Sequence, residues 1–150
     1  MRYLNKIVFI NSAAIRYSEV QLDGNIHLIG TQGVGKSTIL RAILFFYNAD
    51  TQRLGIPVEK KSYQDYYFPY ADSSIIYEVA REDGWFTVLS YKTMNRICYR
   101  FIASPYRPDL FIDEEGAPYP SDRIRSVLDK NGIKYSGAIS TYEEYRNILY

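Results

Sequence analysis

The sequence predicts an α/β fold in a single domain, and three observations lead to this class. Strand-like runs fill much of the first thirty residues, a glycine-rich motif follows at the junction of a strand and a helix, and strand-like runs return from residue 74. Strands on both sides of an amphipathic helix are typical of a sheet with helices packed against it. The length of 150 residues and the apolar fraction of 47% suit one globular domain with its own core.

Three short strands are expected before the glycine-rich motif. The runs KIVFINSA (6–13) and YSEVQLD (17–23) are rich in strand-forming residues and are joined by a turn. A second turn at Asp23-Gly24 leads into NIHLIG (25–30), which ends at the first glycine of the motif. We expect a structural role for His27 in this third run, because no second ligand stands at metal-binding spacing.

The stretch GTQGVGKST matches the phosphate-binding pattern G-x-x-x-x-G-K-[ST] at every fixed position. Glycines let the backbone wrap around phosphate oxygens, and successive N–H groups then bind the anion. Lys36 would place a positive charge on the β- and γ-phosphates, and the Ser37 hydroxyl would bind Mg²⁺. The predicted nucleotide-binding residues of the motif are Gly30, Gln32, Gly33, Val34, Gly35, Lys36, Ser37 and Thr38.

A helix is predicted directly after the motif, over KSTILRAILFFY (36–47), because its apolar residues recur at helical spacing. The following residues, 48–73, are polar and aromatic, and they are interpreted as a long loop. Three further strands, SIIYEVA (74–80), WFTVLSY (85–91) and RICYRFIA (96–103), then predict an antiparallel meander, whose first turn is REDG.

The C-terminal third is predicted to hold two more helices and a strand. Ser121 is a candidate N-cap for a helix that Gly132 ends, and IKYSGAI (133–139) is strand-like. Thr141 and Glu144 have the spacing of a capping box for a last helix.

The run LFIDEEG (110–116) resembles two nucleotide-site motifs. Asp113 and Glu114 after three apolar residues resemble a Walker B strand, and Asp113-x-x-Gly116 resembles a GTPase phosphate-sensing loop. The run is short and follows Pro108 and Asp109, so a strand that ends in an acidic turn is the favoured interpretation.

Net charge and cysteine content exclude few functions. The formal net charge of +1 gives no overall attraction to nucleic acid. Five basic residues are candidates for a DNA-facing patch or, as the favoured alternative, a solvated face: Lys60, Lys61, Arg96, Arg100 and Arg107. Cys98 is expected to be a buried apolar residue.

The sequence contains neither a signal peptide nor a membrane-length apolar run, so a cytoplasmic protein without membrane contact is expected.

Residues 6–47 resemble the N-terminal part of SMC-type ATPase heads, a group that includes chromosome-organising SMC proteins, MukB-like and Wadjet-type condensins and double-strand-break repair ATPases. The resemblance rests on two strands, a third strand ending in a G-x-x-x-x-G-K-S motif, and the pair Ala42-Ile43 in the next helix. It implies a P-loop NTPase fold of the ABC-type head. Residues 1–150 would form one domain, the N-terminal lobe of a split head, with a mixed sheet, an antiparallel meander and few helices.

The resemblance also implies ATP and Mg²⁺ as cofactors, a second head as partner (a homodimer or the C-terminal lobe of the same protein), and DNA. ATP would be hydrolysed in the head dimer, and this lobe alone would bind ATP without efficient turnover. Arg16 would lie near the adenine or the α-phosphate; the alternative is that Arg16 is simply an exposed residue of the turn. Tyr17 would either stack on adenine or lie in the core. Gln32 replaces a frequent asparagine, and the family's Q-loop glutamine has no counterpart, because Gln64 comes too early.

Two other functions are compatible with the motif. A self-contained small P-loop kinase or GTPase would use Asp113 as its Mg²⁺ ligand and turn over alone. A non-catalytic interaction module would bind nucleotide without depending on the γ-phosphate.

Overall fold

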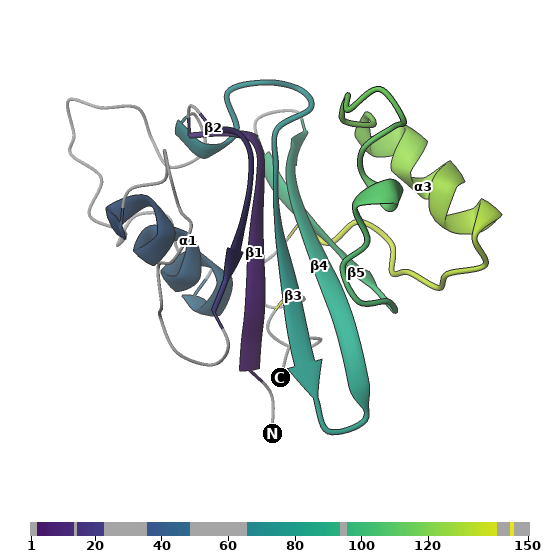
Figure 1. Cartoon of the computed structure of the whole chain (residues 1–150), viewed down its shortest axis with the longest axis horizontal. Coiled ribbons are helices and arrows are strands. Elements are labelled where there is room, and N and C mark those ends of the chain that lie inside the picture. The colour runs from purple at the N-terminus through teal and green to yellow at the C-terminus, as the bar shows by residue number, and fades with distance from the viewer. Residues whose placement is uncertain are drawn as a thin grey trace.

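A computed structural model of the chain describes residues 3–13, 15–22, 36–48, 66–93, 96–140 and 145. A five-stranded sheet with the order β2-β1-β3-β4-β5 forms its centre. The strands are β1 (Tyr3–Ser12), β2 (Ile15–Gln21), β3 (Ser74–Arg81), β4 (Gly84–Thr93) and β5 (Arg96–Ile102). Helix α1 (Lys36–Asn48) lies on one face of the sheet and α3 (Ser121–Lys130) on the other, as Figure 1 shows.

The ladders between these five strands are all antiparallel, which confirms the predicted meander of β3, β4 and β5. The turn REDG joins β3 to β4, and Gly84 adopts a φ of 140° there, which side chains with a Cβ rarely tolerate. The strand expected at 25–30, which would make the sheet mixed, lies outside the described residues.

The central strands are apolar on both faces because both faces are covered. Along β1, Ile7 and Phe9 point toward α1, while Val8 and Ile10 point toward α3, and all four are buried. A strand covered on both sides has a nearly continuous apolar sequence, and KIVFI is such a run.

Two apolar clusters therefore form, one on each side of the sheet. The α1-face cluster joins α1 through Ile39, Ala42, Phe45 and Phe46 to the sheet and to Tyr67, Phe68 and Tyr145. The α3-face cluster joins Ile124 and Leu128 of α3 to the other face of the sheet and to Tyr106, Leu110 and Phe111.

The segment predicted as the strand LFID has a different structure. Residues Pro108–Leu110 form a short 3-10 helix, η2, and Ile112 makes only a single bridge, with Pro118. Proline at its first position favours a helical turn, and burial of Leu110 and Phe111 in the α3-face cluster accounts for the apolar pattern.

Helix α3 ends as predicted, but its start differs. Pro120 is the N-cap residue and Ser121 is the first helical residue, with no side-chain cap. At the other end Gly132 has a φ of 68°, and the amides of Gly132 and Ile133 bond to the carbonyls of Asp129 and Leu128, which is a Schellman motif.

The strand-like segment after α3 follows the edge of β5 irregularly. It makes two isolated antiparallel bridges, between Tyr135 and Ile102 and between Ile139 and Tyr99. The helix predicted after Thr141 falls outside the described residues, apart from Tyr145. No helix among the described residues is long and apolar enough to cross a bilayer.

Candidate nucleotide-binding site

Helix α1 begins at Lys36, the lysine of the phosphate-binding motif. Lys36 and Ser37 are thus its first two residues, which confirms the predicted helix. The first four N–H groups of a helix have no intrahelical acceptor, and they carry a partial positive charge that favours an anion. The rest of the motif, including Gly30, Gln32, Gly33, Val34 and Gly35, lies outside the described residues.

Three tyrosine hydroxyls, here called the tyrosine row, hold α1 in place: that of Tyr77 in β3 and those of Tyr67 and Tyr145, which lie outside the strands. They donate to backbone carbonyls four residues apart along the helix: Tyr67 to Thr38 at 2.8 Å, Tyr77 to Ala42 at 3.0 Å, and Tyr145 to Phe46. Residues four apart lie on one side of an α-helix, so the row fixes which side of α1 faces the sheet.

Tyr67 is the member of the tyrosine row nearest to the motif, and it is fully buried. The Tyr66 ring packs edge-on against it at 4.9 Å, and the Arg41 side chain hydrogen-bonds to its hydroxyl. Burial, more than the neighbouring Tyr66, raises the pKa of Tyr67 well above its usual value. The hydroxyl therefore remains a donor at neutral pH.

The turn between β1 and β2 lies at the same end of the sheet as the first turn of α1. The Ser73 hydroxyl donates to the Asn11 carbonyl and accepts from the Tyr70 amide at 2.9 Å, which ties this turn to the segment that carries Tyr67. Asn11 and Ala13 have φ values of 45° and 48°, an uncommon conformation for residues with a Cβ.

Ser12, between these two residues, is fully buried, and its hydroxyl has no hydrogen-bond partner among the residues that the structure describes. The strained turn and the Ser12 hydroxyl thus lie at the end of the sheet where α1 begins.

Arg16 and Tyr17 follow this turn at the start of β2, and both side chains are exposed. Tyr17 donates to Glu19 at 2.7 Å and pairs with the Tyr106 hydroxyl at 2.9 Å, on the α3 face. The core alternative for Tyr17 is wrong, because its side chain is 40% exposed, and the adenine-stacking alternative stays a prediction. Arg16 is exposed at the start of β2, and its proximity to a nucleotide also stays a prediction.

Asp113 lies in a turn on the α3 face, across the sheet from α1. Its Oδ1 accepts from the amides of Glu115 and Ala117, both at 2.9 Å, and the residue before it packs on the α3-face cluster. The interpretation of Asp113 as the Mg²⁺ ligand of the motif is not supported, because the sheet separates Asp113 from α1. Asp113 instead stabilises its own turn.

The described arginines of the predicted DNA patch have different environments, and Arg96 is exposed at the start of β5. Arg100 is buried, donates to the Ser136 carbonyl at 2.7 Å and stacks on Tyr135 at 5.3 Å. Arg107 pairs with Asp109 at 2.7 Å, and this contact raises the pKa of the Arg107 guanidinium and lowers that of the Asp109 carboxyl. Lys60 and Lys61 lie outside the described residues.

Cys98 is a buried member of the α3-face cluster, as predicted. Burial raises the pKa of its thiol. In the described part of the chain, no group of three or more His, Cys, Asp or Glu side chains is arranged to hold a metal ion.

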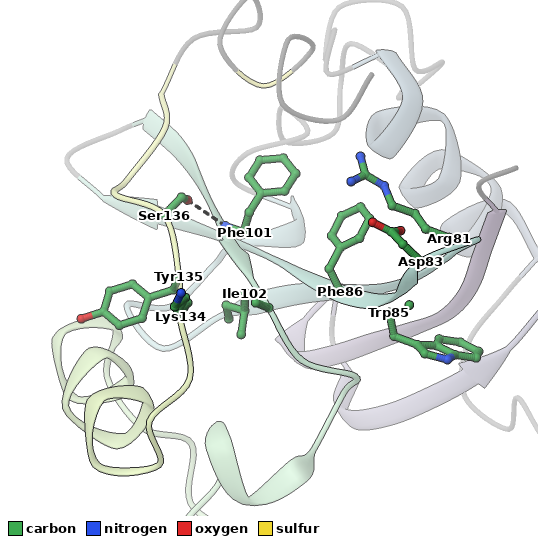
Figure 2. A pocket seen from close by; sticks show the side chains of 11 residues that line it. Arg81, Asp83, Trp85, Phe86, Phe101, Ile102, Lys134, Tyr135 and Ser136 are labelled. Atoms are coloured by element: carbon green, nitrogen blue, oxygen red, sulfur yellow. Dashed lines mark hydrogen bonds between the residues drawn. The ribbon is translucent and has the colours of Figure 1, made fainter.

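A pocket of about 390 Å³ lies at the far end of the sheet, around the turn between β3 and β4 (Figure 2). Phe86 and Phe101 form one wall, the Arg81 guanidinium stacks over Phe86 at 4.6 Å, and Lys134 to Ser136 line the other side. Since β3 runs from the Tyr67 end toward this turn, the pocket is remote from the start of α1.

Sequence reasoning missed the role of Tyr67. Its only local signal is the run Tyr66-Tyr67-Phe68, an aromatic cluster within the segment interpreted as a loop. Such a cluster indicates burial, but its partner Thr38 is far away in the sequence.

Comparison with known proteins gives one match. The profile of a family described as "Protein of unknown function (DUF3584)" matches residues 11–150. No curated protein and no solved structure matches the chain. Because the match covers most of the sequence, the chain belongs to this family, DUF3584.

Proposed function

We propose that this chain is the ATP-binding N-terminal lobe of an SMC-like ATPase head. The observation that carries the proposal is the start of α1 at Lys36, directly after an intact phosphate-binding motif. A helix that follows such a motif would direct the N–H groups of its first turn at phosphate.

The surroundings of the first turn support the same function. The strained turn at Asn11 and Ala13 and the exposed Arg16 lie at this end of the sheet, with the Ser12 hydroxyl, which has no partner in the described part of the chain. Strain and unsatisfied polar groups concentrate at binding sites, where a ligand or partner can offset them. Arg16 is the candidate contact for the adenine or the α-phosphate.

The residues of the motif fit a magnesium nucleotide. Lys36 would bind the β- and γ-phosphates, the Ser37 hydroxyl would bind Mg²⁺, and the N–H groups at the start of α1 would bind phosphate oxygens. The bound nucleotide supplies the phosphoryl group, whose hydrolysis we assign to a pair of heads. In that arrangement ATP lies between this lobe and a second head, and hydrolysis drives movement of attached coiled coils and DNA.

The position of Asp113 favours a lobe without its own catalytic acid over a self-contained enzyme. A small P-loop kinase or GTPase that used Asp113 would need this carboxylate near the motif, but it stabilises a turn on the opposite face. We therefore expect binding of ATP without efficient turnover by the chain alone.

The test is a calorimetric titration of Mg-ATP into the chain, with hydrolysis followed in the same sample. Lys36→Ala should weaken binding by about 30-fold or more, because it removes a charged contact to phosphate. Lys130→Ala is the matched control, since Lys130 is exposed at the end of α3 on the other face. It should leave the affinity unchanged.

Three results would contradict the proposal. Turnover by the chain alone that requires Asp113 would indicate a self-contained enzyme. Equal affinity for Mg-ATP and Mg-ADP, with no effect of the γ-phosphate on self-association, would indicate a non-catalytic module. Binding that Lys36→Ala does not weaken would place the nucleotide elsewhere.

A further inference from the structure

We propose that Tyr67 is a positioning residue for the nucleotide site: its hydroxyl holds the first turn of α1 in the orientation that binds phosphate. This inference rests on the proposed function, because it assigns a role at the same site. It names a residue outside the phosphate-binding motif and separated from it in the sequence by residues 39–66.

The first step is the position of the acceptor. Thr38 lies in the first turn of α1, two residues after Lys36, and its carbonyl accepts from the Tyr67 hydroxyl at 2.8 Å. A carbonyl has two lone pairs, so this bond can form beside the intrahelical bond of the same group. The first turn of a helix frays most easily, and a bond to its backbone from a buried donor opposes fraying.

The second step is the direction of the free N–H groups. The first four amides of α1 have no acceptor within the helix and are the groups that would bind phosphate. Their direction follows from the tilt and winding of the first turn. A donor bonded to the Thr38 carbonyl therefore influences where these amides point, although it does not touch the nucleotide.

The third step is the rigidity of Tyr67 itself. It is fully buried with Phe68 beside it, and Tyr66 packs against its ring. Its hydroxyl also hydrogen-bonds to Arg41, which lies three residues after Thr38 and so on the same side of the helix. The tyrosine thus contacts α1 at two neighbouring points, which restrains the start of the helix more than one contact would.

The tyrosine row supplies an internal control. Tyr77 makes the same kind of bond, from a buried hydroxyl to an α1 carbonyl, but its acceptor Ala42 lies one turn farther from the motif. Removing this hydroxyl loosens the contact between helix and sheet without releasing the first turn. A residue that only stabilises the fold and one that positions the site can therefore be separated.

The experiment compares wild type, Tyr67→Phe and Tyr77→Phe in two measurements, thermal unfolding and the Kd for Mg-ATP. Each substitution removes one buried hydrogen bond and keeps the ring, so both should lower Tm by about 2–6 °C. Tyr67→Phe should also raise the Kd by roughly 5- to 10-fold, because the lost bond restrains the binding conformation. Tyr77→Phe should change the Kd by less than about 2-fold.

A second readout does not depend on stability. Fluorotyrosine placed at position 67 keeps the hydroxyl donor and should restore the wild-type Kd, and its ¹⁹F resonance should shift on addition of Mg-ATP. The same label at position 77 should shift much less.

The outcomes distinguish the two proposals. Equal Kd values for Tyr67→Phe and Tyr77→Phe, or an unchanged ¹⁹F resonance at position 67 while wild type binds Mg-ATP, would overturn the role of Tyr67 and leave the proposed function intact. Wild-type binding that is absent, or unaffected by Lys36→Ala, would overturn both.

Discussion

The two faces of the sheet hold their helices by different means. On one face, α1 receives three tyrosine hydroxyls along a row of its backbone carbonyls and packs aromatic rings, including Phe46 against Tyr77 at 4.8 Å. On the other face, α3 buries a narrow apolar stripe, Ile124 and Leu128, and is otherwise mostly exposed.

This difference indicates what each helix must do. An apolar stripe permits small shifts because dispersion contacts have no preferred direction. Hydrogen bonds to successive turns fix both the rotation of a helix and its position along its axis. The α1 face therefore holds its helix in one orientation, as the phosphate-binding role that we propose for α1 requires, whereas the α3 face mainly covers the sheet.

The largest predicted effect comes from removing an aromatic ring from the α1 face. Phe46→Ala should lower the free energy of unfolding by about 3–5 kcal/mol, because Phe46 is 2% exposed and packs against Tyr77 and Tyr145. Leu128→Ala on the α3 face should cost about 2–4 kcal/mol. Urea unfolding measures both losses.

Nucleotide binding sharpens this prediction. Ile39→Ala should weaken Mg-ATP binding, because Ile39 is fully buried in the first turn of α1, whereas Leu128→Ala should leave the affinity of the folded protein unchanged. Leu40→Ala is a control on the same helix, since Leu40 is 43% exposed, and should cost less than about 0.5 kcal/mol. If Leu128→Ala weakened binding as much as Ile39→Ala, the contrast between the faces would not hold.

The next effect concerns a buried carboxylate on the α3 face. Glu78 is 6% exposed, and its two oxygens accept from the Asn5 side-chain amide at 2.8 Å and from the Tyr106 backbone amide at 2.7 Å. Glu78→Gln replaces one acceptor by a donor and leaves a buried N–H unpaired. We expect a loss of about 1–3 kcal/mol in urea unfolding.

Glu19→Gln serves as the control, because Glu19 is more exposed and contacts Lys6 at 3.3 Å and Tyr17 at the surface. It should cost less than about 1 kcal/mol. Equal losses of unfolding free energy for Glu78→Gln and Glu19→Gln would mean that the burial of Glu78 contributes little to stability.

Much of the fold was predictable because its signals are local. The turn REDG, the β-branched and aromatic runs around it and the helical spacing after Lys36 identified β3, β4 and α1. The segment at 108–112 was misjudged because its apolar residues are buried by tertiary packing on the α3-face cluster, while Pro108 favours a 3-10 turn.

Of the candidate site, only the contiguous motif and the helix that follows it could be predicted from the sequence. The start of α1 at Lys36 follows from the motif, but Tyr67 and Arg100 acquire their roles from distant partners, Thr38 and the Ser136 carbonyl. No periodicity encodes such pairs, because they depend on how the chain folds back on itself.

A smaller effect should appear at alkaline pH. Burial, together with the nearby Glu19, raises the pKa of Tyr17 to about 12, and burial also raises that of Tyr106. Unfolded tyrosine titrates near pH 10, so above this pH the unfolded chain loses protons that the folded protein keeps. The stabilisation that these two tyrosines contribute is therefore present in full below pH 10, and it is lost as the pH rises through their folded-state pKa values.

Tyr106→Phe tests this prediction through urea unfolding at several pH values between 8 and 11. The variant should be less stable at pH 8, but its further loss by pH 11 should be smaller than that of wild type by up to about 1.4 kcal/mol. Tyr70→Phe, at a side chain that is 63% exposed, should leave the pH dependence as it is. Parallel curves for wild type and Tyr106→Phe would contradict the prediction.

The smallest effect concerns the end of α3. Gly132 has a φ of 68°, and a Cβ built on it would meet no atom within 4 Å, so the cost of Gly132→Ala is the left-handed backbone alone, about 1 kcal/mol. Gly137 has equally open surroundings without a positive φ, and Gly137→Ala should be neutral or stabilising by a few tenths of a kcal/mol. Equal losses at the two glycines would show that backbone handedness is not the cause. Gly132→Ala should bind Mg-ATP like wild type, since the end of α3 lies across the sheet from α1, and a change in affinity would show that the two faces are coupled.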